Sequence, residues 1–179
     1  MRSMKFFASF VLILFAYSSA AAQDLVLWRD SKTLKYGFSD QEGNIVIAPQ
    51  FDLLKPVQNG TWVTKVGKKY GLLNKKGQEV IAPKYDSVQI VANSCVIVGL
   101  EKKFGVVNAK GKEVIAPAFT AVQILQNNVI KVNNGEKLGC YALDGKQILA
   151  ADYDHITFIE GSRVQARKGS RTTTHALPK

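Results

Sequence analysis

The stretch that decides the fold is YGLLNKKGQEVIAPKYDSVQ at residues 70–89, and FGVVNAKGKEVIAPAFTAVQ repeats its pattern at residues 104–123. Each stretch has an aromatic residue first, glycine second and eighth, and proline fourteenth. The two begin 34 residues apart, with no insertion or deletion between them. Similarity at a fixed period of this length is typical of tandem repeats, in which each copy is one small structural unit.

Working outward from this pair, the same pattern is found on both sides. The first copy reads YGFSDQEGNIVIAPQFD and the fourth LGCYALDGKQILAADYD, where Ala151 replaces the proline. The four copies are 36–69, 70–103, 104–137 and 138–171, and residues 23–35 are predicted to be a partial N-terminal copy in which Trp28 aligns with Trp62. The structural markers of the repeat are Gly37, Gly71, Gly105, Gly139, Gly43, Gly77, Gly111, Gly145, Pro49, Pro83 and Pro117.

The spacing of glycine and proline excludes helices. One of them occurs about every six residues in the first half of each copy, and a helix of three turns does not tolerate this. The short β-branched segments between them are typical of strands. In the first copy we expect strands near 36–40, 44–48, 53–58 and 61–66.

The turns between these strands have a recognisable chemistry. Asp40, Asn74 and Asn108 each precede a glycine by three residues. Such a side chain accepts a hydrogen bond from the backbone two residues on, and the glycine then takes the left-handed conformation that closes the hairpin. The predicted fold is therefore all-β: tandem 34-residue antiparallel meanders that bury their apolar faces by stacking.

The sequence leaves the overall shape of this curved stack open. Four copies are compatible with an open solenoid or with a small propeller-like ring. A strand at 26–30 would either pair with the last copy to close the ring or cap the first copy. Residues 172–179 are polar, and we expect them to form a flexible tail.

Residues 1–22 have the three parts of a secretory signal peptide. Arg2 and Lys5 precede an apolar run at 6–17, and Ala20 and Ala22 form a small-residue cleavage signal. The alternative is an uncut anchor, but 12 apolar residues fall short of the roughly 20 that span a bilayer. We therefore expect an exported protein, periplasmic or secreted, with no transmembrane segment after cleavage before Gln23. Its formal charge would fall from +10 to +8, since the leader holds two basic residues and no acidic ones.

The repeated elements resemble the WG-repeat family, whose unit runs from an aromatic-glycine pair through a glycine turn to a V-I-x-P-x-aromatic-Asp segment. Here these are Tyr70-Gly71, Gly77, residues 80–83 and Tyr85-Asp86, and the resemblance covers 36 to about 171. Two departures are the absence of tryptophan before the first glycine and Thr120 in place of aspartate. The resemblance implies an all-β interaction domain of exported bacterial proteins, with no catalytic residues to transfer.

No constellation of residues predicts catalysis, a metal site or a cofactor. His155 and His175 are 20 residues apart, and Asp154 and His155 would point to opposite faces of a strand. The recurring carboxylates at 52, 86 and 154 follow an aromatic residue in each copy. We interpret them as turn caps, because Thr120 keeps the oxygen and loses the charge. We expect Cys95 and Cys140 to be buried core residues, with a disulfide as the alternative.

The functional hypothesis concerns lysines at the turns between copies. If the copies stack regularly, these residues form a basic edge that binds an extended anionic polymer such as an acidic polysaccharide. Nucleic acid is the less favoured polymer, because no exposed aromatic residues are interleaved with the lysines. The alternatives are solvated lysines without a ligand, and a structural or inhibitory partner of another envelope protein that uses an apolar surface or an edge strand. The candidate ligand-binding residues are Lys68, Lys69, Lys102, Lys103, Lys137 and Arg171.

Overall fold

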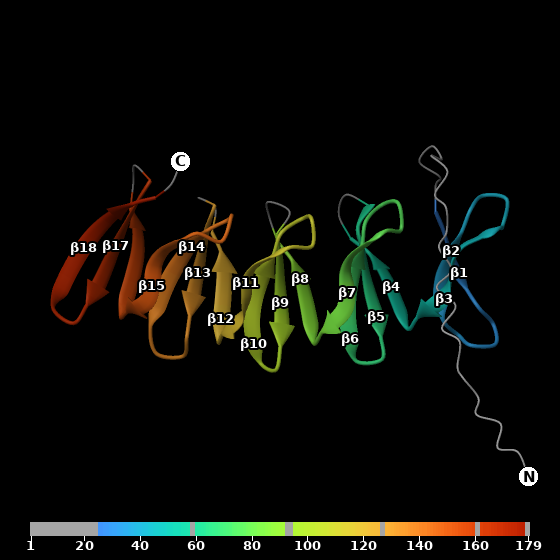
Figure 1. Ribbon diagram of the computed structural model, residues 1–179, viewed down its shortest axis with the longest axis horizontal. Helices are drawn as coiled ribbons and strands as arrows, with labels where there is room; N and C mark the ends of the chain where they lie inside the picture. The colour runs from blue at the N-terminus through green and yellow to red at the C-terminus, as the bar shows by residue number, and fades with distance from the viewer. Residues whose placement is uncertain (1–24, 58–59, 92–94, 126–127, 160–161, 178–179) are drawn as a thin grey trace, which may run out of the picture.

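The computed structural model describes residues 25–57, 60–91, 95–125, 128–159 and 162–177. Within these ranges the extended secondary structure consists of strands, arranged in five antiparallel sheets and joined by turns. The sheets stand in a row, and the first and last described strands lie at opposite ends of it (Figure 1). The predicted all-β repeat fold is confirmed, and the stack is open rather than closed into a ring.

The predicted leader lies outside the described residues. Among the residues that are described, no helix has the length and apolar character needed to cross a membrane.

The five sheets are named A to E in chain order. Sheet A contains β1 (Val26–Arg29), β2 (Tyr36–Ser39) and β3 (Ile45–Phe51). Sheet B contains β4 (Leu53–Pro56), β5 (Trp62–Val66), β6 (Lys69–Leu73) and β7 (Glu79–Tyr85). Sheet C contains β8 (Ser87–Ile90), β9 (Val96–Leu100), β10 (Lys103–Val107) and β11 (Glu113–Phe119). Sheet D contains β12 (Ala121–Ile124), β13 (Val129–Asn133), β14 (Leu138–Ala142) and β15 (Gln147–Tyr153). Sheet E contains β16 (His155–Ile159), β17 (Arg163–Lys168) and β18 (Arg171–Ala176).

The sheets are offset by half a copy from the sequence repeat. Sheet B, for example, takes β4 and β5 from the end of the first copy and β6 and β7 from the start of the second. The chain passes to the next sheet at a single residue, and these crossing residues are Asp52, Asp86, Thr120 and Asp154. Each copy thus contributes to two neighbouring sheets, so that the repeat cannot complete a sheet by itself.

Geometry requires glycine at the turns and at the points where one strand bulges over its neighbour. The turn glycines have positive φ, such as 74° at Gly77, as the turn chemistry predicts. At Gly71 a Cβ would lie 2.4 Å from the backbone oxygen of Ile81, because β7 bulges across β6 at this point. Gly37, Gly105 and Gly139 face the same close approach from β3, β11 and β15.

Two details at the ends of the chain correct the sequence-based expectations. Trp62 lies opposite Leu73, and the residue equivalent to Leu73 in the first copy is Ser39. The partner of Ser39 is Val26 and not Trp28, so the predicted alignment of Trp28 with Trp62 is wrong in the structure. The register shifts because six residues connect β1 to β2, whereas two connect β5 to β6. Strand β1 caps the first copy and does not meet the last one.

The predicted flexible tail at 172–179 is also corrected. Most of it is β18, which pairs with β17 along its whole length, and Leu177 is buried. The polar side chains of this segment suit an edge strand with one solvated face, which a search for apolar residues overlooks.

The core lies in four layers between successive sheets. Phe38 and Leu54 belong to the A–B layer, Leu72 and Val98 to the B–C layer, and each of the other two layers draws on both of its sheets in the same way. Apolar side chains at one repeat position therefore form the core of several layers, and no layer exists until two sheets meet.

Candidate functional site

The six candidate ligand-binding residues lie in or next to one set of turns in the structure. The turns that join β5 to β6, β9 to β10, β13 to β14 and β17 to β18 line up along one side of the stack (Figure 1). These turns, with the residues next to them, carry the six candidate residues. Lys68, Lys102, Lys103 and Arg171 are exposed, whereas Lys69 and Lys137 are half-buried.

Carboxylates at the sheet crossings neutralise part of this edge. Lys69 Nζ donates to Asp86 Oδ1 at 2.6 Å, while the backbone N–H of Glu101 donates to the other carboxylate oxygen at 2.8 Å. The lysine and this N–H hold the pKa of the Asp86 carboxyl below its ordinary value. Because Lys69 lies in sheet B and Glu101 in the turn of sheet C, the carboxylate ties two sheets together.

The same contact recurs at two other crossings. Asp52 joins Lys35 to the backbone N–H of Gly67, and Asp154 joins Lys137 to that of Gly169. These carboxylates cap turns, as the sequence indicates, but each turn lies 15 residues further along the chain rather than next to the aspartate.

The third crossing lacks the carboxylate. Thr120 donates from Oγ1 to the backbone oxygen of Asn133, and no acidic group from this position reaches Lys103. Four candidate residues, Lys68, Lys102, Lys103 and Arg171, thus stand on the edge without an aspartate from a sheet crossing beside them. The basic edge is interrupted rather than continuous.

A second surface gathers at the N-terminal end of the stack. Most of the exposed large apolar side chains among the described residues belong to sheet A or to its β1–β2 connection. Ile45 is 60% exposed and Trp28 36%. Since β1 is an edge strand with no described strand on its outer side, its side chains lack the cover that β4 gives to β5. We name this group of exposed side chains the apolar end: Val26, Leu27, Trp28, Leu34, Ile45 and Val46.

A groove adjoins the apolar end where sheets A and B meet. It has a volume of about 480 Å³ and is lined by residues of β3, β5, β6 and β7. We name it the first-junction groove: Ile47, Gln50, Phe51, Val66, Leu73 and Glu79 are among its lining residues.

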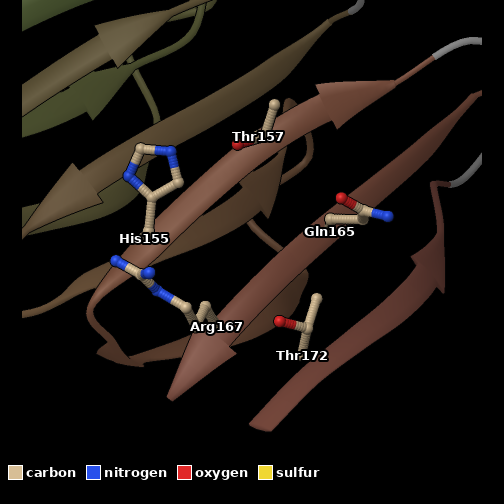
Figure 2. A pocket seen from close by; sticks show the side chains of 5 residues that line it. All are labelled: His155, Thr157, Gln165, Arg167 and Thr172. Carbon is tan, nitrogen blue, oxygen red and sulfur yellow. The ribbon is translucent and has the colours of Figure 1, made fainter. Parts of the chain in front are cut away.

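The C-terminal end of the stack is polar instead. His155, Thr157, Gln165, Arg167 and Thr172 share the outer face of sheet E, where they line a shallow hollow of about 280 Å³ (Figure 2). Thr173 stands where β2, β6, β10 and β14 have glycine, and its Oγ1 bonds to Ala166 O and lies 2.8 Å from His175 Nε2. No further strand crosses β18 in the described chain, so a side chain fits there.

The other residues singled out from the sequence have structural surroundings. Cys95 and Cys140 are free and buried, in different core layers, and burial raises the pKa of the Cys140 thiol to about 11. A thiol in this environment is a poor nucleophile. In the described part of the chain, no group of three or more histidine, cysteine or acidic residues is placed to hold a metal ion.

The sequence pattern does not predict the apolar end, for a physical reason. Trp28 aligns with Trp62, Val96, Ile130 and Val164, which are apolar in every copy, and this pattern predicts burial for Trp28 as well. The signal that reveals its exposure is positional: the first strand of a repeat array has no preceding strand to cover it.

Comparison with protein families identifies the repeat. The profile described as WG containing repeat matches residues 36–70, 70–103 and 104–137. No curated protein matches the chain.

Several solved structures share part of the arrangement. A eukaryotic initiation factor matches 89% of this chain and 50% of its own length at 12% identity, with a TM-score of 0.41. KlHsv2 with its loop 6CD replaced matches 82% of this chain and 58% of its own length at 10% identity, with a TM-score of 0.36. PorZ, a surface component of the type-IX secretion system of Porphyromonas gingivalis, matches 87% of this chain and 26% of its own length at 13% identity, with a TM-score of 0.34. The chain spans about half or less of two of these structures and somewhat more of KlHsv2.

Proposed function

Because the chain belongs to the family described as WG containing repeat, we propose that it is an exported, non-catalytic interaction module that binds another protein of the cell envelope through its apolar end. The observation that carries this proposal is the asymmetry of the stack. Large apolar side chains are exposed on sheet A, whereas the outer face of sheet E is polar. Large apolar side chains that are exposed together at one end of a domain mark interaction surfaces.

The chemistry of the apolar end suits a protein partner. Trp28 and Leu27 lie on neighbouring positions of an edge strand, where a partner strand would find both backbone groups and apolar side chains. Aromatic residues are enriched at the centres of interfaces, and Trp28 offers such an anchor at this end of the stack. The proposal therefore favours the alternative stated from the sequence over the polymer-binding hypothesis.

The test is a pull-down with the protein lacking residues 1–22 against envelope fractions at low and high salt. A partner held by apolar contacts should be retained at high salt and lost from the variant with Val26→Ser and Trp28→Ser. A matched control is Thr157→Ser with Thr172→Ser, which changes exposed residues at the opposite end. A partner that the double serine variant retains would contradict the proposal.

Anionic polymer binding is the second candidate, favoured by the four edge residues without an aspartate beside them. Binding to an acidic polysaccharide should weaken steeply as salt rises, because each contact releases counterions. Changing Lys68, Lys102 and Lys103 to Glu should abolish it, whereas Lys75, Lys76 and Lys110 changed to Glu on the opposite edge should not. Equal effects of the two triple variants would contradict a specific edge.

A further inference from the structure

The first-junction groove can be compared with the same place at the next junctions, because the repeat presents equivalent residues each time. At the B–C junction, Tyr85 takes the position of Phe51, Lys84 that of Gln50, and Glu113 that of Glu79. Tyr85 OH donates to Glu113 Oε1 at 2.5 Å, and Lys84 Nζ donates to the same oxygen at 2.8 Å. At this junction, sheet B thus supplies a phenol and an ammonium group to a carboxylate of sheet C.

The C–D junction is filled in a different way. Phe119 takes the position of Phe51, and Tyr141 takes that of Leu73. The two rings pack edge to face with their centroids 5.9 Å apart. Gln147 replaces the glutamate, so this junction has no carboxylate that needs a cation.

The first junction has the carboxylate without its partners. Phe51 has no hydroxyl, Gln50 has no charge, and among the described residues no hydrogen bond or ion pair reaches the Glu79 side chain. Beside Glu79, the groove presents Phe51 and Leu73, which are almost completely buried, and Val66, which is 40% exposed. The surface is an apolar trough with one acidic group.

We propose that the first-junction groove binds a lysine or arginine side chain of the protein partner. The apolar stem of this side chain would lie on Phe51, Val66 and Leu73, and its cation would pair with Glu79. A residue of the partner would thus form the ion pair that Lys84 forms with Glu113 within this chain. This inference rests on the proposed function and deepens it, since the groove adjoins the apolar end. A cation with a long apolar stem matches both the apolar lining and the carboxylate of the groove. A free metal ion matches only the carboxylate, and an acidic segment would be repelled by it.

The test uses the peptide acetyl-Val-Lys-Val-amide and its counterpart with norleucine, which keeps the stem and lacks the ammonium group. Each is titrated into the isotope-labelled chain from residue 23 onward, and amide chemical shifts are followed. The lysine peptide should shift the amides of Leu73, Gly77 and Glu79. It should bind about three- to five-fold more tightly than the norleucine peptide, the factor expected of an exposed ion pair.

Two variants and a control make the result decisive. Glu79→Gln should bring the two affinities together, and Gln50→Lys with Phe51→Tyr should abolish binding by supplying the B–C contacts internally. Glu42→Gln, an exposed glutamate of the same sheet region, should leave both affinities unchanged. Equal binding of the two peptides to the unmodified chain, or shifts confined to other residues, would overturn the inference.

The proposed function is separable from this inference. A partner that is lost from the Val26→Ser, Trp28→Ser variant but kept by both groove variants would overturn the lysine-binding groove and leave the apolar end as the interface. Loss from all of these variants, with retention by Glu42→Gln, supports both.

Discussion

The Asp86 carboxylate and the Lys69 ammonium group lie 2.6 Å apart, although 17 residues of sequence separate them. Asp86 is the residue at which the chain passes from sheet B to sheet C, and its other oxygen accepts the N–H of Glu101 from sheet C. A contact at the surface therefore helps to set the placement of two sheets whose main contact is the core layer between them.

The missing contact at the third crossing leads to the first prediction. Thr120→Asp should let Lys103 form the pair found at the other crossings. Its melting temperature should rise by about 1–3 °C, the range expected of an exposed ion pair in a chain of this length. Thermal unfolding checks this. The gain should vanish when Lys103→Met is added, and a gain that persists would point to a cause other than the pair.

Acid should weaken the contacts that Asp86 makes with Lys69 and Glu101 over a defined pH range. The pKa of the Asp86 carboxyl is lowered below its ordinary value of 3.8, first by the Lys69 hydrogen bond and then by the Glu101 N–H. A lowered folded-state pKa stabilises the fold above the unfolded-state pKa, and this stabilisation is lost as pH falls through the folded-state value. Urea unfolding should show Asp86→Asn less stable than the unmodified chain at pH 7, with the difference shrinking below pH 3.8. A difference independent of pH would exclude this linkage.

A buried hydroxyl offers a stabilising substitution. Thr64 is 1% exposed, and its Oγ1 is the one buried side-chain polar atom in the described chain without a hydrogen-bonding partner. The equivalent residues in the next three copies are Val98, Val132 and Ala166. Thr64→Val keeps the shape and removes the desolvated group, so the free energy of unfolding should rise by about 1 kcal/mol. Urea denaturation measures it, with the exposed Thr157→Val as a control that should change little.

The close approach of β7 to β6 predicts that Gly71 does not tolerate a side chain. Gly71→Ala places a Cβ 2.4 Å from Ile81 O and 2.8 Å from Pro83 N, so β7 must move away from β6. The free energy of unfolding should fall by about 2–3 kcal/mol. Thr173→Gly, at the corresponding position of β18, should cost less because no strand of the described chain crosses it. A chain in which Gly71→Ala unfolds at the same urea concentration as the unmodified protein would refute this account of the conserved spacing within the repeat.

Local chemistry made much of the fold predictable. The turn at Asn74 follows from its side chain, which accepts the N–H of Lys76 at 2.9 Å, and Gly77 adopts the positive φ that this turn requires. The half-copy offset of the sheets was not predictable in this way. It depends on where one sheet ends and the next begins, which is at Asp86 between β7 and β8. A periodic sequence does not indicate this boundary, because its repeating unit can be started at any residue.

The candidate site was harder to predict, because it depends on contacts between distant residues. The repeat places the candidate lysines at equivalent turns, but the aspartates that pair with Lys69 and Lys137 lie 17 residues away. The apolar end depends on the absence of a described strand beyond β1. Residue types alone do not distinguish Trp28 at the edge from Trp62 inside the stack.

The threonine at position 173 has a consequence for how such a molecule changes in size. A strand of the β7 type cannot cross β18 in the usual manner, and the arginines of β17 give the last sheet a face that water solvates well. Extra 34-residue units are therefore accommodated by duplication within the row, between sheets that already bury both faces. The number of units can vary in this way, and the polar face of sheet E disfavours contact with the apolar end of a second molecule, because Arg167 would lose its hydration there.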